Sequence, residues 1–97
     1  MFGQGKLSVE KILEADEGES FKYVRHSGGF SFGADWETHR YMIPKDCEPL
    51  SAGSFYIFKG GIRINREGSL TLHLNPDEED SKRLSVLFGI PCSFRDP

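Results

Sequence analysis

The sequence has few cysteines and no long apolar segment, and both features exclude classes of protein. Only Cys47 and Cys92 occur among its 97 residues, whereas a small secreted domain stabilised by disulfides has about four or more cysteines. No apolar segment approaches the roughly 18 residues that span a bilayer, and no hydrophobic region of a signal peptide follows Met1. We therefore expect a cytoplasmic protein outside the membrane, and leave open whether the two cysteines pair.

The sequence also lacks a strong excess of charge and any clustered metal or phosphate motif. Its 15 acidic and 12 basic residues give a net charge of −3, so a nucleic-acid backbone is not expected as a partner. No group of cysteines and histidines has zinc-ligand spacing, and the glycine pairs at 28–29 and 60–61 lack the strand–loop–helix context of a phosphate-binding loop. The sequence therefore predicts no cofactor, no metal site and no catalytic residue, within a single domain over 1–97.

Two short amphipathic helices are predicted, one towards each end of the chain. Near the N-terminus, Ser8 is expected to cap a helix whose apolar stripe is Val9, Ile12 and Leu13. Towards the C-terminus, a second helix is expected to begin with Asn75 as its cap, Pro76 in its first turn and Glu78 completing a capping box. Its buried stripe is expected to be Leu84, Leu87 and Phe88, and Gly89 and Pro91 are expected to end it.

Between the helices, alternating segments separated by glycines predict a series of hairpins. The glycine pairs at 28–29 and 60–61 are each expected to form a two-residue loop. A three-residue turn at 66–68, with its glycine in the left-handed conformation, is expected to lead into a last strand carrying Leu70, Leu72 and Leu74. The two hairpin loops predict these cross-strand neighbours: Arg25 and Phe32, Lys22 and Asp35, Ile57 and Ile64, and Phe58 and Arg63.

These elements predict a two-layer α+β domain with a five-stranded antiparallel meander, in the order α-β-β-β-β-β-α. A small five-stranded β-barrel is the alternative. The segment 44–53, which contains two prolines, is expected to be a loop, and the last residues from Ile90 to Pro97 a short extension. A bulge at Gly33 would reverse the orientation of residues 34–43, so their orientation stays open.

One face of the predicted sheet has no helix to cover it, and it carries aromatic and basic side chains. In the expected registers Tyr56, Phe58 and Arg63 project from this face, together with His73 and His39. Tyrosine, phenylalanine and arginine are enriched where proteins dock, and such patches on an uncovered sheet mark interfaces. We therefore interpret the chain as a protein-binding module of inhibitor or adaptor type, with these five residues in its site. The partner is another protein or a second copy in a homodimer.

Two alternative functions rest on charged residues. Asp35, Glu37 and His39 alternate along a predicted strand, so their side chains would point the same way and could serve a metal-assisted hydrolase. The acidic clusters at 14–19 and 77–80 could instead imitate nucleic acid and block a protein that binds it. Exposed charges and helix ends account for both features more simply. The non-enzymatic interpretation is therefore preferred, and the question of an enzyme stays open.

Overall fold

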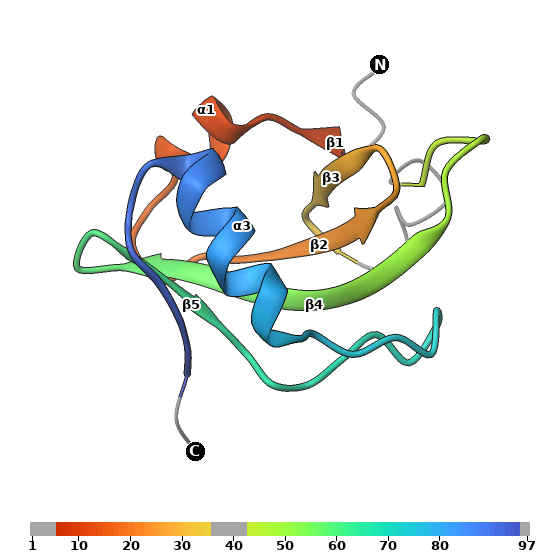
Figure 1. The fold of residues 1–97 in the computed structure, drawn as a ribbon. Helices are drawn as coiled ribbons and strands as arrows, with labels where there is room; N and C mark the ends of the chain where they lie inside the picture. Colours follow the sequence, from red (N-terminus) through yellow and green to blue (C-terminus); the bar gives the residue numbers. More distant parts are fainter. Residues whose placement is uncertain (1–5, 36–42, 96–97) are drawn as a thin grey trace.

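A computed structural model describes residues 6–35 and 43–95, and its helices and strands form two layers (Figure 1). Within these residues the helices are α1 (Val9–Leu13) and α3 (Glu78–Phe88). The strands are β1 (Lys6–Leu7), β2 (Ser20–His26), β3 (Gly29–Gly33), β4 (Pro49–Phe58), β5 (Gly61–Ile64) and β6 (Cys92–Phe94). The described strands form one open sheet in the order β1-β3-β2-β4-β5-β6. The prediction of helices packed on a sheet is confirmed, and the barrel alternative is wrong because β1 and β6 remain two separate edges.

The sheet is mixed rather than an antiparallel meander. Four of its neighbouring pairs are antiparallel, but β6 runs parallel to β5, with Ile62 beside Cys92 and Ile64 beside Phe94. Parallel neighbours need a crossover, and here the chain returns from β5 through α3 to β6. The predicted C-terminal extension is therefore an edge strand. Its hydrogen bonds with β5 include those donated by the Ile62 amide to the Pro91 carbonyl and by the Arg95 amide to the Ile64 carbonyl.

Both predicted hairpins form, but each expected register is wrong by two residues. In the second hairpin the two loop residues are Lys59 and Gly60, with φ of 55° and 75°. Positive φ at both loop positions is the geometry of a type I′ turn, which matches the twist of the strands and favours glycine at its second position. Gly60 occupies that position, so Gly61 belongs to the strand that follows. The observed neighbours are Tyr23 and Phe32, Arg25 and Phe30, Tyr56 and Arg63, and Phe58 and Gly61. A two-residue shift keeps every side chain on its expected face, so the division into apolar and polar faces survives.

Strand β4 begins at Pro49, inside the segment predicted as a loop. Its first residues pair with β2, where Ser51 lies beside Arg25 and Ala52 beside Val24. A proline is tolerated as the first residue of a strand because it has no amide hydrogen to donate. The register then shifts, because His26 pairs with Pro49 and Leu50 is left opposite no residue of β2. This bulge redirects the Leu50 side chain.

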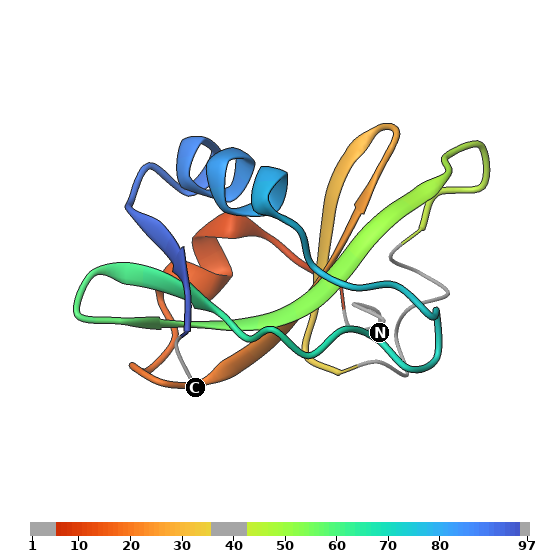
Figure 2. The same ribbon diagram turned by 60° about the horizontal axis from the view of Figure 1, so that its bottom comes forward.

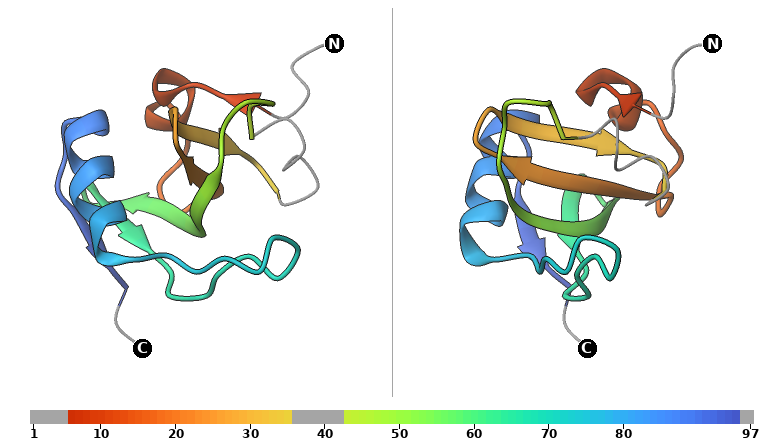
Figure 3. Two further views of the ribbon diagram at one scale, coloured as in Figure 1. Left: turned by 45° about the vertical axis from the view of Figure 1, so that its right-hand side comes forward. Right: turned by 90° about the vertical axis from the view of Figure 1, so that its right-hand side faces the viewer.

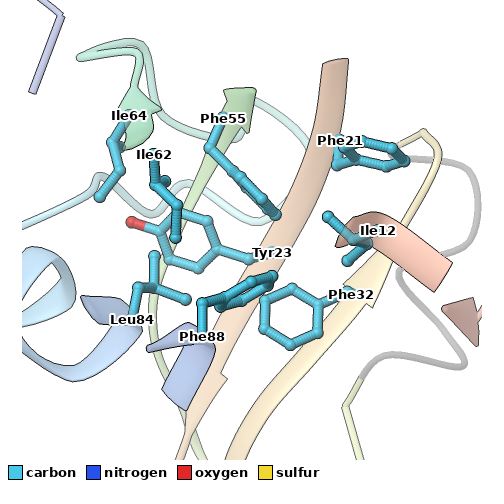
Figure 4. Close-up of a cluster of buried hydrophobic side chains, with 9 residues drawn as sticks. All are labelled: Ile12, Phe21, Tyr23, Phe32, Phe55, Ile62, Ile64, Leu84 and Phe88. Carbon is cyan, nitrogen blue, oxygen red and sulfur yellow. The ribbon is translucent and has the colours of Figure 1, made fainter. Parts of the chain in front are cut away.

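The main core lies between the sheet and the two helices. Figure 2 shows α1 and α3 on the same side of β4 and β5. Buried aromatic and aliphatic side chains from both layers meet there, with the rings of Phe32 and Phe88 edge to face at 5.3 Å between centroids. The buried members of this core, drawn in Figure 4, are Ile12, Phe21, Tyr23, Phe32, Phe55, Ile62, Ile64, Leu84 and Phe88.

The predicted strand over 69–74 is a loop. The Ser69 and Leu74 backbones pair with each other and close it, while the Ser69 hydroxyl accepts from the Leu72 amide at 3.1 Å. Leu72 and Leu74 pack on Val24 and Ala52 from the side of the sheet opposite the helices. Figure 3 shows the segment between β5 and α3, in teal, extending away from β5 and returning. Local hydrogen bonds from a serine hydroxyl thus compete successfully with the sheet ladder.

The turn before this loop needs glycine for a different reason from the one expected. The φ of Gly68 is not positive. A Cβ added at Gly68 would instead lie 2.1 Å from the carbonyl oxygen of Leu74. Close approach of two backbone segments, rather than a left-handed conformation, therefore excludes any side chain at this position.

Two of the three predicted helix ends are confirmed. Ser8 caps α1, and its hydroxyl accepts from the Lys11 amide at 3.2 Å. Gly89 ends α3 with φ of 73°. The start of α3 was expected at Asn75, but its cap is Asp77, whose carboxylate accepts from the Asp80 amide while the Asp80 carboxylate accepts from the Asp77 amide. The capping box therefore begins two residues later, because Asp80 is fixed by contacts with the sheet that are described below.

Candidate functional site

Three of the five predicted binding residues lie together on the side of the sheet opposite the helices. Tyr56 of β4 is the direct cross-strand neighbour of Arg63 of β5, and Phe58 lies two residues further along β4 on the same face. Phe58 is 40% exposed. A shallow depression of about 470 Å³ adjoins them, and its lining includes Tyr56, Phe58, Asn65 and Arg95. We call Tyr56, Phe58, Arg63, Asn65 and Arg95 the open-face patch.

The charges around the open-face patch are mixed. The Lys59 ammonium lies 5.2 Å from the centroid of the Phe58 ring, and Arg63 donates to the Ser93 hydroxyl at 2.8 Å. Within the described part of the chain, neither Arg63 nor Arg95 forms an ion pair. Glu17 lies at the same end of the sheet, where its carboxylate accepts from the Lys59 backbone amide at 3.1 Å. The open-face patch therefore has both cations and a carboxylate beside its aromatic rings.

The other two predicted binding residues do not join the patch as expected. His73 is exposed, but it lies in the loop closed by Ser69 and Leu74, with φ of 55°, and not on a strand. Its expected place on the sheet is wrong because that strand does not form. His39 lies outside the described residues.

The predicted metal triplet is only partly within the structure. Asp35 follows β3 and is exposed, whereas Glu37 and His39 lie outside the described residues. Over 6–35 and 43–95, no group of three or more histidine, cysteine or acidic side chains is arranged to hold a metal ion.

A second surface feature, which the sequence did not indicate, is a groove on the helix side of the sheet. It has a volume of about 750 Å³, and its lining residues come from α3, from the β2–β3 hairpin and from Leu50 of β4. Figure 2 shows how α3 and the β2–β3 hairpin lie relative to β4. Leu50, Val86 and Leu87 line it and are 45%, 84% and 47% exposed. They are three of the six large apolar side chains that the described residues expose. The prediction that Leu87 belongs to the buried stripe is wrong, because α3 turns this side chain towards the groove.

The wall of this groove is fixed by a buried polar network. Asp80 of α3 is fully buried, and it accepts hydrogen bonds from the Tyr23 hydroxyl, from Arg25 Nε at 2.7 Å and from the Ser51 hydroxyl at 2.7 Å. Arg25 also binds Asp77 at 2.9 Å. The network ties the first turn of α3 to β2 and β4.

Ionisation favours this arrangement. Burial alone would raise the pKa of Asp80, but the hydrogen bonds from Tyr23 and Ser51, the Asp77 amide and Arg25 outweigh it, so its pKa is lowered. Burial and the Asp80 carboxylate raise the pKa of Tyr23, so its hydroxyl keeps the proton that it donates. Two of the four acids at 77–80, Asp77 and Asp80, therefore form ion pairs with Arg25 of the same chain.

The two cysteines are free thiols. Burial, together with the charge of Asp80, raises the pKa of the Cys92 thiol to about 11, which makes it a poor nucleophile at neutral pH. Cys47 lies against the β2–β3 turn, where a Cβ added at Gly28 would be 2.8 Å from its sulfur.

No protein-family model matches the sequence, and neither curated proteins nor solved structures show a significant similarity to it. Among the described residues, no helix has the length and apolar character needed to cross a membrane.

Proposed function

We propose that this chain is a non-enzymatic cytoplasmic binding module, an inhibitor or an adaptor, which docks on a partner protein through the open-face patch. The observation that carries the proposal is the direct pairing of Tyr56 with Arg63 beside an exposed Phe58, on the part of the sheet that neither helix covers. Tyrosine and arginine are enriched among the few residues that carry most of the binding energy of an interface, and phenylalanine is enriched in interfaces relative to the rest of the protein surface.

Only one end of the sheet face opposite the helices is covered by other side chains, and this supports the same proposal. Leu72 and Leu74 cover Val24 and Ala52 at one end of the face, so the apolar surface there is already used. At the other end, Tyr56 and its neighbours line an open depression. A partner that presents an apolar side chain to Phe58, and acceptors to the guanidinium of Arg63, fits this surface. A second copy of the chain satisfies the same requirement, since Glu17 lies at the edge of the patch.

The test compares Phe58→Asp with the matched control Leu70→Asp. Both substitutions place a carboxylate at an exposed apolar position, but Leu70 lies in the loop after β5 and is 88% exposed. Each protein is immobilised, lysate of the source organism is passed over it, and retained proteins are identified by mass spectrometry. Light scattering on each purified protein measures self-association, and circular dichroism verifies folding.

We expect the wild type and Leu70→Asp to retain the same partner or to form the same dimer, and folded Phe58→Asp to lose it. Retention by all three proteins would place the interface elsewhere. A monomeric wild type that retains nothing specific would reject the binding proposal for this face, and titration with Zn²⁺ and Mn²⁺ would then test the hydrolase alternative.

A further inference from the structure

We infer that the groove between α3 and the β2–β3 hairpin is a second docking site, which binds an amphipathic, acidic helical segment of a partner protein. This inference goes beyond the proposed function, because the groove lies on the helix side of the sheet and the open-face patch on the other side. Two independent docking surfaces on opposite faces would make the chain an adaptor that joins two partners.

Exposed aliphatic side chains are concentrated in this groove. Val86 and Leu87 on α3 face Leu50 and Phe30 across the groove. Exposed apolar residues scattered singly are ordinary, but half of the large ones exposed in the described chain gather here. The bulge in β4 contributes directly, because it leaves Leu50 without a neighbour on β2 and its side chain lines the groove. Bulges that redirect a side chain in this way are typical of functional surfaces.

The charge of the groove defines the complementary charge of its occupant. Arg25, Lys82 and Arg83 line it, with Glu79 as the acid among the lining residues. Arg25 is bound by Asp77 and Asp80, and Arg83 by Glu79 at 3.0 Å. Lys82 forms no ion pair with any described residue. An occupant with aliphatic side chains on one face and a carboxylate next to them would pair with Lys82 while covering Val86 and Leu87.

The shape of the groove favours a peptide over a small molecule. A small-molecule site typically encloses most of its ligand, whereas the rim residue Val86 is 84% exposed, so a small ligand would remain largely in water. The short edge strands β1 and β6, with two and three residues, offer little backbone for an added strand. A helix laid beside the 11 residues of α3 would instead place side chains along the whole groove.

The experiment selects ligands without assuming their sequence. A phage-displayed library of random peptides of about 12 residues, which as helices would be about 18 Å long, is selected on the immobilised protein. The most enriched peptide is synthesised, and its affinity is measured by fluorescence anisotropy. The variants are Val86→Asp and Lys82→Glu in the groove, with Leu70→Asp and Phe58→Asp as controls outside it. Circular dichroism verifies that each variant folds.

We expect enriched peptides with apolar residues at helical spacing and at least one acid next to them. Val86→Asp and Lys82→Glu should each weaken binding about tenfold or more, while both control variants bind as the wild type does. The inference is overturned if no peptide is enriched, if the peptides lack acids, or if the groove variants bind unchanged. Two other results without peptide binding would also overturn it. Binding of sodium oleate would favour a lipid as the occupant, and self-association that is lost in Val86→Asp would favour a second copy of the chain. Loss of peptide binding in Phe58→Asp alone would show that the peptide binds the open-face patch and not the groove.

Discussion

Replacement of the buried Asp80 by asparagine is the most direct test of how the structure holds α3 against the sheet. The substitution keeps the size of the side chain but removes its charge, and it replaces one of two acceptor oxygens by a donor. Four donors meet the carboxylate: the Tyr23 hydroxyl, Arg25 Nε, the Ser51 hydroxyl and the Asp77 amide. At least one donor would face the new amide group without an acceptor.

The expected loss follows from these contacts. Breaking a buried ion pair by removing one partner costs about 3–5 kcal/mol. The Arg25 side chain is 15% exposed and keeps Asp77 as a partner, so we expect Asp80→Asn to cost about 3 kcal/mol, at the lower end of that range. The control is Glu79→Gln, which removes the same charge in the same helical turn. Its exposed ion pair with Arg83 is worth under about 1 kcal/mol.

Urea unfolding at pH 7 measures the free energy of unfolding of both variants and of the wild type. The same measurement in a series down to pH 2 tests how the contribution of Asp80 depends on pH. Because the pKa of Asp80 is lowered in the folded state, its contribution is complete above the unfolded value of about 3.9 and is lost as the pH falls through the folded value. The difference between wild type and Asp80→Asn should therefore shrink below about pH 4. This account of the network would be refuted if the free energy of unfolding of Asp80→Asn at pH 7 lay within about 1 kcal/mol of the wild-type value, or if Asp80→Asn and Glu79→Gln lost the same free energy.

Three further predictions concern backbone and thiol. Gly68→Ala forces a Cβ against the Leu74 carbonyl, so thermal unfolding should show a loss of about 1–3 kcal/mol; an unchanged melting temperature would contradict the close approach. Gly60→Ala places a side chain at φ of 75° and should cost about 1–2 kcal/mol by the same assay, whereas a stabilised variant would mean another turn type. Alkylation of Cys92 by iodoacetamide should accelerate up to about pH 11; a rate that levels off near pH 8 would contradict the raised pKa.

Local patterns in the sequence determined the features that depend on near neighbours along the chain. The Ser8 cap and the Gly89 end of a helix are properties of single turns, and they appear as expected. The alternation in β2, β4 and β5 also placed Tyr56, Phe58 and Arg63 on one face. Side-chain alternation has a period of two, so even a register wrong by two residues leaves the composition of each face intact.

Competition between segments that are distant in sequence decided the rest, and it could not be predicted from local pattern. Residues 69–74 alternate as a strand would, yet the edge beside β5 is occupied by Cys92–Phe94, which α3 returns to it. The cap of α3 moves to Asp77 because Asp80 is held by side chains of β2 and β4.

Tyr56, Phe58 and Arg63 of the open-face patch could therefore be predicted from the sequence, whereas Arg95, which follows β6, and the groove could not. Strand alternation alone brings Tyr56, Phe58 and Arg63 to one surface, because neighbours on a face follow from spacing along the chain. The groove needs a bulge at Leu50 and a helix whose exposed side, with Lys82 and Val86, faces a distant hairpin. Those positions depend on how the layers pack, and packing is set by the whole core and not by any segment of it.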